Sequence, residues 1–434
     1  MSREMRHSGI EWIGEIPKEW KLPRLKNVAE LHGRIGWNGL RSEEFEERSY
    51  AYLVTGQDFK SSIIDWTNCY QIRKERYDED TFIQLKNGEL LITKDGTIGK
   101  VAVVSNMDKP ACLNSGIFVL RQKLDSFVPK FLYWQLCSSL LKTYNNYMNL
   151  GGTTIIHLYQ NVFERMPLVA PPLSEQQKIA NYLDKVCGEV DEMIALQEQM
   201  IEELKAYKQS VITEAVTKGL NLDVPMKDSG IDWIGDVPEH WEVRRIGNLF
   251  KLRDEKNYKP MDEVQLLSLY TGIGVFPHGE QEERGNKAIT VEGYKVVHKD
   301  DIVVNIILAW MGAIGVSNYD GVTSPAYDVY IPDLSKVVPH FFHYVFRTQG
   351  IAGECYKYGR GIMMMRWRTY SSEFKQIRVP FPSMEEQQSI ASYLDTKCAE
   401  IDALIAIKQA KIEELKEYKK SVIYEYVTGK KEVV

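Results

Sequence analysis

Two short stretches contain residue types that could do chemistry, but neither has the spacing that such chemistry requires. TKDGTIGK (93–100) combines glycines with a lysine, as phosphate-binding loops do, yet it lacks the G-x-x-x-x-G-K-[ST] pattern. HFFH (340–343) places two histidines three residues apart, with no cluster of further ligand types nearby in the sequence. We therefore predict a tight turn at the first stretch and no metal site at the second.

The familiar signatures of catalysis are also missing from the sequence. None of H-E-x-x-H, G-x-S-x-G, G-x-G-x-x-G after a strand, or the [ND]-P-P-[YF] motif of amino-methyltransferases occurs. We predict no catalytic residues, although lysine, aspartate and serine can form a dispersed site that no short motif reveals.

Three glycine-rich stretches carry side chains that suit contacts with phosphates and base edges. They are HGRIGWNG (32–39), NLGGTTIIH (149–157) and YGRGIMMMRWR (358–368). Ordinary surface turns are the alternative interpretation of each stretch. The candidate DNA-binding residues, with the lysine of TKDGTIGK added, are Arg34, Trp37, Lys94, Thr153, Thr154, His157, Arg360, Arg366 and Arg368.

The elements that must position these residues are duplicated. SGIEWIGEIPKEW (8–20) returns as SGIDWIGDVPEHW (229–241) with eight of 13 positions identical, and the segment 175–217 returns at 386–428 with 26 of 43 identical. The regions between the copies differ, yet GTIG (96–99) aligns with GAIG (312–315), and VPKFLYWQL (128–136) with VPHFFHYVF (338–346). We expect two variable regions that share one mixed α/β fold.

The long repeated segments are predicted to be helices. Their apolar residues recur at gaps of three, four and seven, and 43 helical residues would span about 64 Å. Ser174 with Gln177, and Ser383 with Glu386, are candidate capping boxes. We expect the two helices to pair with each other, the alternative being that each packs on its own domain. The predicted contact positions are Ile179, Leu183, Val190, Ile201, Leu204, Ile390, Leu394, Ile401, Ile412 and Leu415.

The repeat spacing suggests a circle of two modules that has been cut in a linker. Twelve residues separate Thr217 from Ser229, and 14 separate Thr428 from Ser8 through the two chain ends. We predict neighbouring termini and pseudo-two-fold symmetry, which would present the same surface twice. The expected divisions are 1–20, 21–165, 166–240 (with a helix over 174–218), 241–380 and 381–434.

Composition and charge narrow the class of protein. The 434 residues carry a net charge of −6, six cysteines without a C-x-x-C pair, and no apolar run long enough for a membrane span. No signal peptide is visible, so we expect a cytoplasmic protein. Residues 21–165 hold 19 basic and 16 acidic side chains and residues 241–380 hold 18 and 16, whereas both helices are acidic. These weakly basic regions could bind DNA through local patches or could simply have mixed surfaces.

The chain resembles the specificity subunit of type I restriction–modification enzymes. The resemblance is carried by both copies of the short motif, by the helix entry PPLSEQQ (171–177), by DGTIGKV (95–101) and by DIVVNIILAWMGAIGVS (301–317), and it covers essentially the whole chain. It implies two target-recognition domains, each reading one half of a bipartite, asymmetric site on double-stranded DNA. It further implies that the two long helices form an antiparallel coiled coil that sets the spacing.

The resemblance also implies partners and cofactors. Two modification subunits would dock on the helices and bring S-adenosylmethionine, and restriction subunits would add ATP- and Mg-dependent translocation and cleavage. The chain itself would be non-catalytic, without a cofactor, in a prokaryotic cytoplasm. The alternatives are a methyltransferase or nuclease with a dispersed site, and a coiled-coil scaffold that binds only protein.

The repeated motif is not expected to read DNA, because it is the same in two halves that must read different sequences. Trp12, Trp20, Trp233 and Trp241 are instead predicted to pin each variable region to the helix pair.

Overall fold

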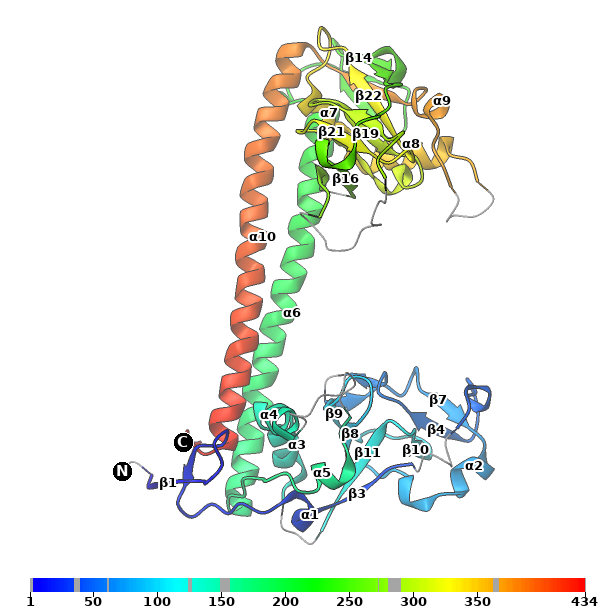
Figure 1. Cartoon of the computed structure of the whole chain (residues 1–434). Helices are drawn as coiled ribbons and strands as arrows, with labels where there is room; N and C mark the ends of the chain where they lie inside the picture. Colours follow the sequence, from blue (N-terminus) through cyan, green and yellow to red (C-terminus); the bar gives the residue numbers. More distant parts are fainter. Residues whose placement is uncertain are drawn as a thin grey trace. The chain divides into compact units, whose positions relative to one another are not determined.

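The computed structural model describes residues 3–34, 40–60, 62–123, 127–148, 157–271, 273–279, 290–361 and 367–433. The chain forms two compact units (Figure 1). The first consists of Met1–Gln197 with Ala410–Val434, and the second of Glu198–Gln409. Each unit therefore contains one variable region, one copy of the repeated motif and one half of each long helix.

The first variable region is built on a four-stranded antiparallel sheet with the order β3-β11-β8-β9. Because side chains alternate along a strand, Leu90 and Ile92 of β8 enter the core beneath α3, whereas Leu91 enters a second core beneath β4 and β10. The sheet is thus buried on both faces, which explains its continuous β-branched and leucine-rich sequence.

The described strands of this unit are β1 (Met5–His7), β2 (Glu15–Pro17), β3 (Ala29–His32), β4 (Ala51–Val54), β5 (Phe59–Lys60), β6 (Ile63–Ile64), β7 (Tyr70–Ile72), β8 (Leu90–Thr93), β9 (Val101–Val103), β10 (Ala111–Leu113) and β11 (Ile117–Gln122). Its helices before the long repeat are α1 (Leu25–Val28), η2 (Ser42–Glu44), α2 (Lys74–Asp78), η3 (Thr81–Ile83), α3 (Pro129–Cys137), α4 (Ser139–Met148) and α5 (Gln160–Phe163).

The second variable region repeats this sheet in the order β15-β22-β19-β20, again antiparallel. Alternate residues of β19 again enter two cores, Ile302 and Val304 on one face and Val303 on the other. The prediction of two variable regions with one shared α/β fold is confirmed.

The described strands of the second unit are β12 (Met226–Asp228), β13 (Asp236–Pro238), β14 (Glu242–Arg245), β15 (Phe250–Leu252), β16 (Leu267–Tyr270), β17 (Gly274–Pro277), β18 (Lys295–Val297), β19 (Ile302–Asn305), β20 (Ile314–Val316), β21 (Gly321–Thr323), β22 (Tyr327–Pro332) and β23 (Arg378–Phe381). Its shorter helices are η4 (Ile246–Asn248), η5 (Met261–Glu263), η6 (Ala309–Met311), α7 (Pro339–Val345), α8 (Gln349–Tyr358) and α9 (Ser371–Phe374).

The predicted alignment of GTIG with GAIG is wrong by three residues. Val101 pairs with Ile92 in β8, and its counterpart in the second sheet is Ile314, which pairs with Val304. Gly99 and Gly312, with φ values of 81° and 82°, therefore occupy the same left-handed turn position. The register is fixed by pairing with the central strand, which a comparison of the two loops alone does not reveal.

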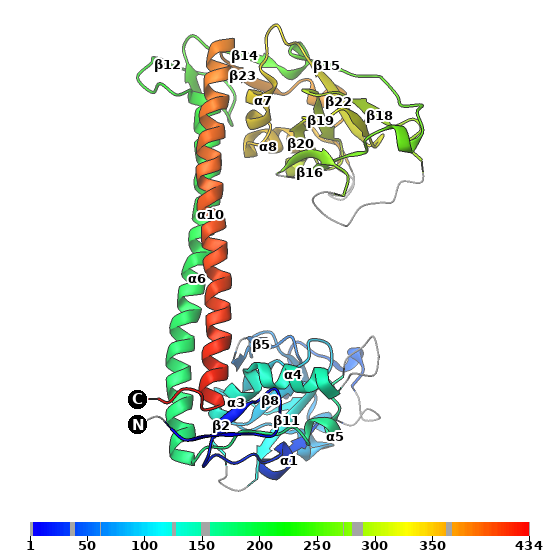
Figure 2. The ribbon, with the colours of Figure 1, turned by 60° about the vertical axis from the view of Figure 1, so that its left-hand side comes forward.

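The long repeated segments form the helices α6 (Leu173–Lys218) and α10 (Met384–Val427), and they lie side by side (Figure 2). In the first unit Lys419 Nζ lies 2.6 Å from Asp191 Oδ1, and in the second Lys208 Nζ lies 2.7 Å from Asp402 Oδ2. Later residues of α6 therefore meet earlier residues of α10, and the predicted antiparallel pairing is confirmed.

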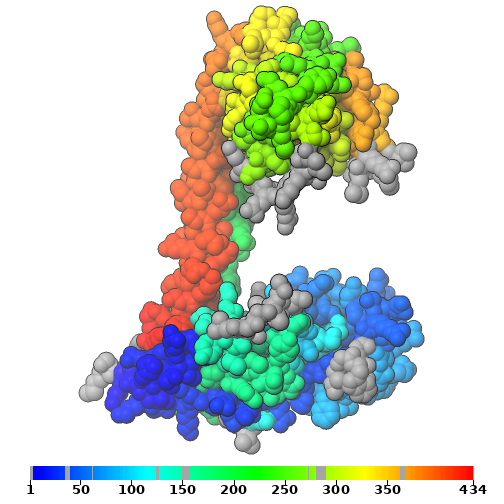
Figure 3. Space-filling model, in the orientation of Figure 1, coloured from blue at the N-terminus to red at the C-terminus, as the bar shows by residue number. Residues whose placement is uncertain are grey.

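The predicted contact positions of the helices are buried, except for Leu204, which is half-buried. The buried positions are Ile179, Leu183, Val190, Ile201, Ile390, Leu394, Ile401, Ile412 and Leu415. Most residues of the outer faces are polar and exposed, with a few exposed apolar side chains such as Leu196 and Ile407 among them. Figure 3 shows the surface of the C-terminal part of α10 in red. One apolar stripe facing a partner helix is the arrangement expected of a coiled coil.

Only one of the two predicted capping boxes forms as expected. Ser383 precedes α10, its Oγ accepts from Glu386 N at 3.3 Å, and Glu386 Oε2 accepts from Ser383 N at 3.1 Å. Ser174 instead lies inside α6, which begins at Leu173, because Pro172 occupies the position that corresponds to Ser383. The two helix starts are equivalent in position but differ in their caps.

The two chain ends belong to the same unit. Figures 1 and 2 both place them beside the end of α10, and a Cβ atom added to Gly14 would lie 3.8 Å from Lys430 Nζ. The predicted circular arrangement is thus confirmed. None of the helices within the described ranges has both the length and the apolar character needed to cross a membrane.

Candidate nucleic-acid interface

The repeated motif joins the start of one long helix to the end of the other. Trp20 Nε1 donates to Glu175 Oε2 at 3.0 Å in the first turn of α6, and Trp241 Nε1 donates to Glu386 Oε1 at 2.9 Å in the first turn of α10. Both tryptophans are almost fully buried. Each indole thus fills an apolar site and keeps its N–H satisfied.

The far side of each indole lies against a glycine just after the other helix. A Cβ atom added to Gly429 would lie 2.8 Å from the Trp20 ring, and one added to Gly219 would lie 3.1 Å from the Trp241 ring. Both glycines have positive φ, which ends the helix and lets the ring approach the backbone.

A second tryptophan of each motif contacts the variable region. The Trp12 ring lies 4.8 Å from the Tyr147 ring and 6.2 Å from the Tyr144 ring, both on α4. Trp233 contacts the equivalent helix α8 near its start, and it covers Gly350 so closely that a Cβ atom there would lie 2.2 Å from the ring. Trp12, Trp20, Trp233 and Trp241 therefore all contact a long helix, the glycine that follows one, or a helix of the variable region.

Two side chains on each long helix hold one helix of the variable region, α3 in the first unit and α7 in the second. Gln176 Oε1 and Gln387 Oε1 accept from the backbone N–H groups of Val128 and Val338, both at 2.8 Å. These bonds satisfy donors at the starts of α3 and α7, which helices leave open.

The second side chain is an aspartate. Asp184 accepts from Trp134 Nε1 at 2.9 Å, and Asp395 accepts from the Tyr344 hydroxyl at 2.7 Å. In each unit the glutamine and the aspartate at equivalent positions of the long helix therefore hold the variable region, although the groups that donate to the aspartates differ.

Glu386 is the most perturbed carboxyl of this set. Partial burial raises its pKa, but hydrogen bonds from Trp241, His240 and Ser383 outweigh burial and lower the pKa to about 2. The carboxylate is thus held in its charged form as a structural acceptor.

Equivalent backbone hydrogen bonds hold the loops at the ends of the two sheets. Leu158 N donates to Lys94 O at 3.1 Å, and Thr369 N donates to Ile306 O at 2.8 Å. These bonds place the segments that follow 149–156 and 362–366 beside the turn after the central strand. Two of the three glycine-rich stretches predicted to face DNA therefore lead to the same position in the two units.

The predicted residues in the first unit have different environments. His157 Nδ1 lies 2.7 Å from Asp95 Oδ1 at the surface of the β8–β9 turn, and Lys94 Nζ lies 4.7 Å above the Phe118 ring. Arg34 is only 2% exposed, and its Nε donates to Leu113 O at 3.1 Å. Its prediction as a DNA contact does not fit this burial, because the guanidinium serves a backbone carbonyl of the domain interior.

In the second unit both described candidates reach the surface. Arg360 is 75% exposed with Nη2 2.7 Å from Glu373 Oε1, and Arg368 is exposed beside it through a mutual backbone bridge. The other candidates, Trp37, Thr153, Thr154 and Arg366, lie outside the described residues.

A polar groove of about 650 Å³ lies at the same end of the first sheet and was missed in the sequence. The side chains that line it include those of Thr55, Gln57, Tyr70, Thr97, Lys100 and Asn114. A signal existed, since Thr55-Gly56 recurs as Thr271-Gly272 at the corresponding strand end. Hydroxyl, amide and ammonium groups in a groove suit base edges and phosphates.

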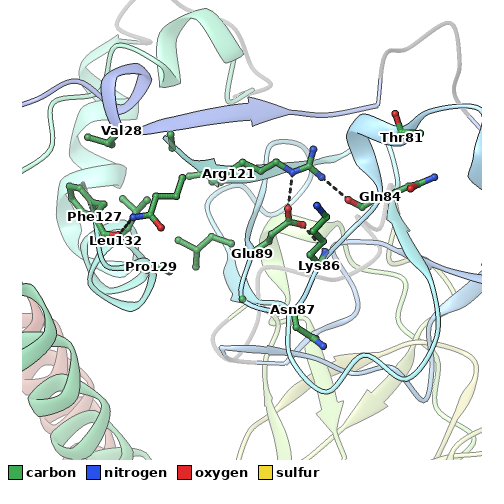
Figure 4. A pocket seen from close by; sticks show the side chains of 15 residues that line it. Val28, Thr81, Gln84, Lys86, Asn87, Glu89, Arg121, Phe127, Pro129 and Leu132 are labelled. Carbon is green, nitrogen blue, oxygen red and sulfur yellow. Dashed lines mark hydrogen bonds and ion pairs between the residues drawn. The ribbon is translucent and has the colours of Figure 1, made fainter. Parts of the chain in front are cut away.

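A second cavity of the first unit, of about 630 Å³, lies between β3, β11 and the start of α3 (Figure 4). Arg121 lines it, but its Nε is 2.7 Å from Glu89 Oε1 and its Nη2 donates to Gln84 O at 2.6 Å. The arginine therefore serves to join β11 to the neighbouring loop.

The histidine pair in HFFH is structural. His340 Nε2 lies 2.6 Å from Asp395 Oδ1, and its ring stacks on that of His343 at 5.6 Å. Burial, then the nearby Arg347, lowers the pKa of His343 to about 3. Across the described ranges, no three histidine, cysteine or acidic side chains gather in a way that could hold a metal ion.

Comparison with known proteins gives one consistent result. The model of the type I restriction modification DNA specificity domain matches residues 17–206 and again 238–417. A putative type I restriction enzyme MjaX specificity subunit of Methanocaldococcus jannaschii is 27% identical over 96% of this chain and 95% of its own length. The EcoBI specificity subunit of Escherichia coli is 26% identical, over 93% and 84% of the two chains.

Solved structures support the fold. A chain from a structure of the assembly and conformational transition of the type I R-M system has a TM-score of 0.68 at 15% identity, covering 95% of this chain and 99% of that one. The HsdS subunit of Thermoanaerobacter tengcongensis has a TM-score of 0.54 at 16% identity, covering 95% and 98%. With two matched domains on a shared helical scaffold, the chain belongs to the type I restriction–modification DNA specificity family, the non-catalytic DNA-recognition component of these systems.

Proposed function

We propose that each recognition domain of this chain reads one half of a bipartite, asymmetric DNA site. The observation that carries the proposal is that the two domains are attached by equivalent contacts, Trp20–Glu175 and Trp241–Glu386, while their loop side chains differ. Two domains that are attached in the same way but differ in their surface side chains can recognise an asymmetric target. The spacing of the half-sites then follows from the geometry of the protein.

Two modification subunits are the proposed partners of the helix pair. In each unit the helices leave three large apolar side chains exposed at equivalent positions, a feature that marks interaction surfaces when it recurs. They are Met193, Leu196 and Tyr418 in the first unit, and Leu404, Ile407 and Tyr207 in the second. A surface presented twice suits two copies of one partner.

The cofactors of the complex are proposed to reside outside this chain. S-adenosylmethionine would bind to the modification subunits, which would methylate adenine, and ATP with Mg²⁺ would bind to restriction subunits. This chain would supply the DNA sequence to which that chemistry is applied, in the cytoplasm of a prokaryote.

Domain exchange tests the reading of half-sites. Residues 21–165 are replaced by the recognition domain of another specificity subunit, and methylated sites are mapped by single-molecule sequencing of the host genome. We expect one half of the methylated site to change and the other half to persist. An unchanged site would favour a scaffold that binds only protein.

Two further measurements test the division of labour. The purified chain with DNA and labelled S-adenosylmethionine should transfer no methyl group, and transfer without any partner would reveal a dispersed active site. Leu196→Glu combined with Ile407→Glu should abolish binding of modification subunits, while the matched polar change Gln199→Glu should not. Retained binding by the double variant would place the docking surface elsewhere.

A further inference from the structure

The turn that follows the central strand is held rigidly in both recognition domains, although by different side chains. In the first domain Thr93 Oγ donates to Thr97 O at 2.5 Å and accepts from Lys100 N at 3.0 Å. In the second domain Asn305 Oδ1 accepts from Ile307 N at 3.0 Å and from Leu308 N at 3.2 Å. Thr93 and Asn305 end β8 and β19 at equivalent places, so both turns present their side chains from a fixed backbone.

The surfaces at the two turns differ in polarity, the first being polar and the second apolar. The first turn borders the polar groove, where the exposed Gln57 and the half-buried Asn114 offer amide groups and Lys100 offers a cation. Asn114 Oδ1 accepts from Ser115 N at 2.7 Å, which ties its oxygen to the connection between β10 and β11. Amide groups in this setting can donate to or accept from base edges.

The second turn presents an apolar tip. Leu308 is 37% exposed and Met311 is 52% exposed. Beneath the tip Trp310 lies 6.1 Å from Tyr356, which stacks on Trp367 at 5.1 Å.

These aromatic rings make the tip a stiff surface, because each indole N–H is bonded to a backbone carbonyl. Trp310 Nε1 donates to Ile307 O and Trp367 Nε1 donates to Tyr356 O, both at 3.0 Å. An exposed apolar tip supported in this way loses little freedom when it is covered.

A segment that carries two exposed arginines is bonded to the turn of the apolar tip. Arg368 immediately precedes Thr369, whose N–H is bonded to Ile306 in the same turn, and Arg360 is bridged to Arg368. An apolar tip beside the exposed Arg368 does not suit a hydrocarbon partner or a free solvent face. It suits the major groove of DNA, where thymine presents a methyl group between phosphate backbones.

Resting on the proposed function, we propose that bases are read at this end of each sheet. The first domain would read its half-site through Gln57 and Asn114, which line the groove beside the first turn, and the second would contact thymine methyl groups through Leu308 and Met311 of its turn. The two domains would thus share a backbone fold but read DNA differently, the first by hydrogen bonds and the second by apolar contacts. The exposed Arg368, on the segment bonded to the second turn, would contact phosphates.

Deoxyuridine substitution tests the second domain, using the chain assembled with its modification subunits and a duplex that contains the mapped site. A half-site methylated on adenine contains thymine on the opposite strand, so a substitutable methyl group is present. Replacing the contacted thymine by deoxyuridine should weaken binding about fourfold or more. The Leu308→Ala/Met311→Ala variant should bind the two duplexes equally, whereas the matched surface variant Leu334→Ala should keep the wild-type preference.

Site selection from randomised duplexes tests the first domain. Gln57→Ala with Asn114→Asp, which retains the oxygen that accepts from Ser115 N, should relax the first half-site and leave the second unchanged. Thr81→Ala, at the rim of the other cavity, should select the wild-type site. Thermal unfolding verifies that each variant folds.

The possible failures are distinguishable. A variant with unchanged deoxyuridine discrimination or an unchanged selected half-site would overturn the proposal for that domain. A folded variant that loses binding to all DNA equally would show that these side chains contribute to non-specific binding, and this result would also overturn the proposal. If exchange of residues 21–165 alters the half-site while these variants do not, only this inference fails, whereas an exchange without effect contradicts the proposed function itself.

Discussion

The first tryptophan of each repeated motif, Trp12 or Trp233, packs on an equivalent helix of the two domains but on different residues of it. Trp12 packs on tyrosines of α4, whereas Trp233 lies directly on the backbone of Gly350 in α8. Gly350 lies in the first turn of α8, and its missing side chain lets the Trp233 ring approach the helix backbone closely.

Gly350→Ala is expected to destabilise the second unit by about 1–3 kcal/mol, because the new Cβ atom would overlap the Trp233 ring. Gly353→Ala on the same helix is the control. Nothing lies within 4 Å of a Cβ atom there, so this change should stabilise the helix by up to about 1 kcal/mol. Hydrogen exchange of the α8 amides measures both effects, and equal effects would contradict the packing of Trp233.

The depressed pKa of Glu386 predicts a pH dependence of stability. A carboxyl whose pKa falls from 4.5 to about 2 on folding stabilises the folded state above pH 4.5, and this contribution is lost as the pH falls toward 2. Glu386→Gln should therefore cost about 1–2 kcal/mol at pH 7, after allowance for solvent screening, and almost nothing near pH 2.

Unfolding by denaturant at several pH values, followed through tryptophan fluorescence, measures this difference. Glu385→Gln, on the neighbouring exposed position, is the control. A pH-independent loss in Glu386→Gln would show that the carboxylate charge does not matter.

At the scale of elements, the sequence predicted what local periodicity and duplication encode. The helix expected over 174–218 is observed as Leu173–Lys218, because its apolar stripe and flanking prolines are local signals. The register of GTIG against GAIG, the burial of Arg34 and the polar groove were not accessible in this way. Each depends on which strand or carbonyl lies opposite, and that partner is distant in the sequence.

The helix pair should act as the spacer between half-sites. Inserting seven residues after Gln197 in α6 and seven after Gln409 in α10 keeps the apolar seam in phase and lengthens the pair by about 10.5 Å. At 3.4 Å per base pair, the mapped site should gain about three spacer base pairs with both half-sites unchanged.

An insertion in one helix alone is the control for spacing. It shifts one half of that helix by two turns against its partner, so the Asp191–Lys419 and Lys208–Asp402 pairs cannot both form and assembly should fail. A paired insertion that leaves the spacer unchanged would show that something other than the helices sets the distance.

At the scale of the whole molecule, each unit is completed by segments from both halves of the chain. The first unit needs Ala410–Val434 to receive its motif, with the Tyr424 hydroxyl donating to Ile13 O at 3.2 Å. In the second unit, α6 reaches its motif through a short exposed connection before β12. The two chain ends of the first unit thus correspond in position to the connection at 219–225 in the second unit, which forms no helix or strand.

A circular permutant should therefore keep the fold. Joining Val434 to Met1 through a short flexible linker and reopening the chain near residues 221–226 moves the break from the first unit to the equivalent site in the second. Since the buried contacts of Trp20 and Trp241 with the helix ends are retained, we expect an unchanged thermal unfolding temperature, assembly with modification subunits and the same methylated site. Reopening at Ile201 instead, a buried position within α6, should abolish assembly because it cuts the helix pair. Loss of assembly in the first permutant, with the second equally inactive, would mean that the linker at 221–226 has a role that the free termini do not share.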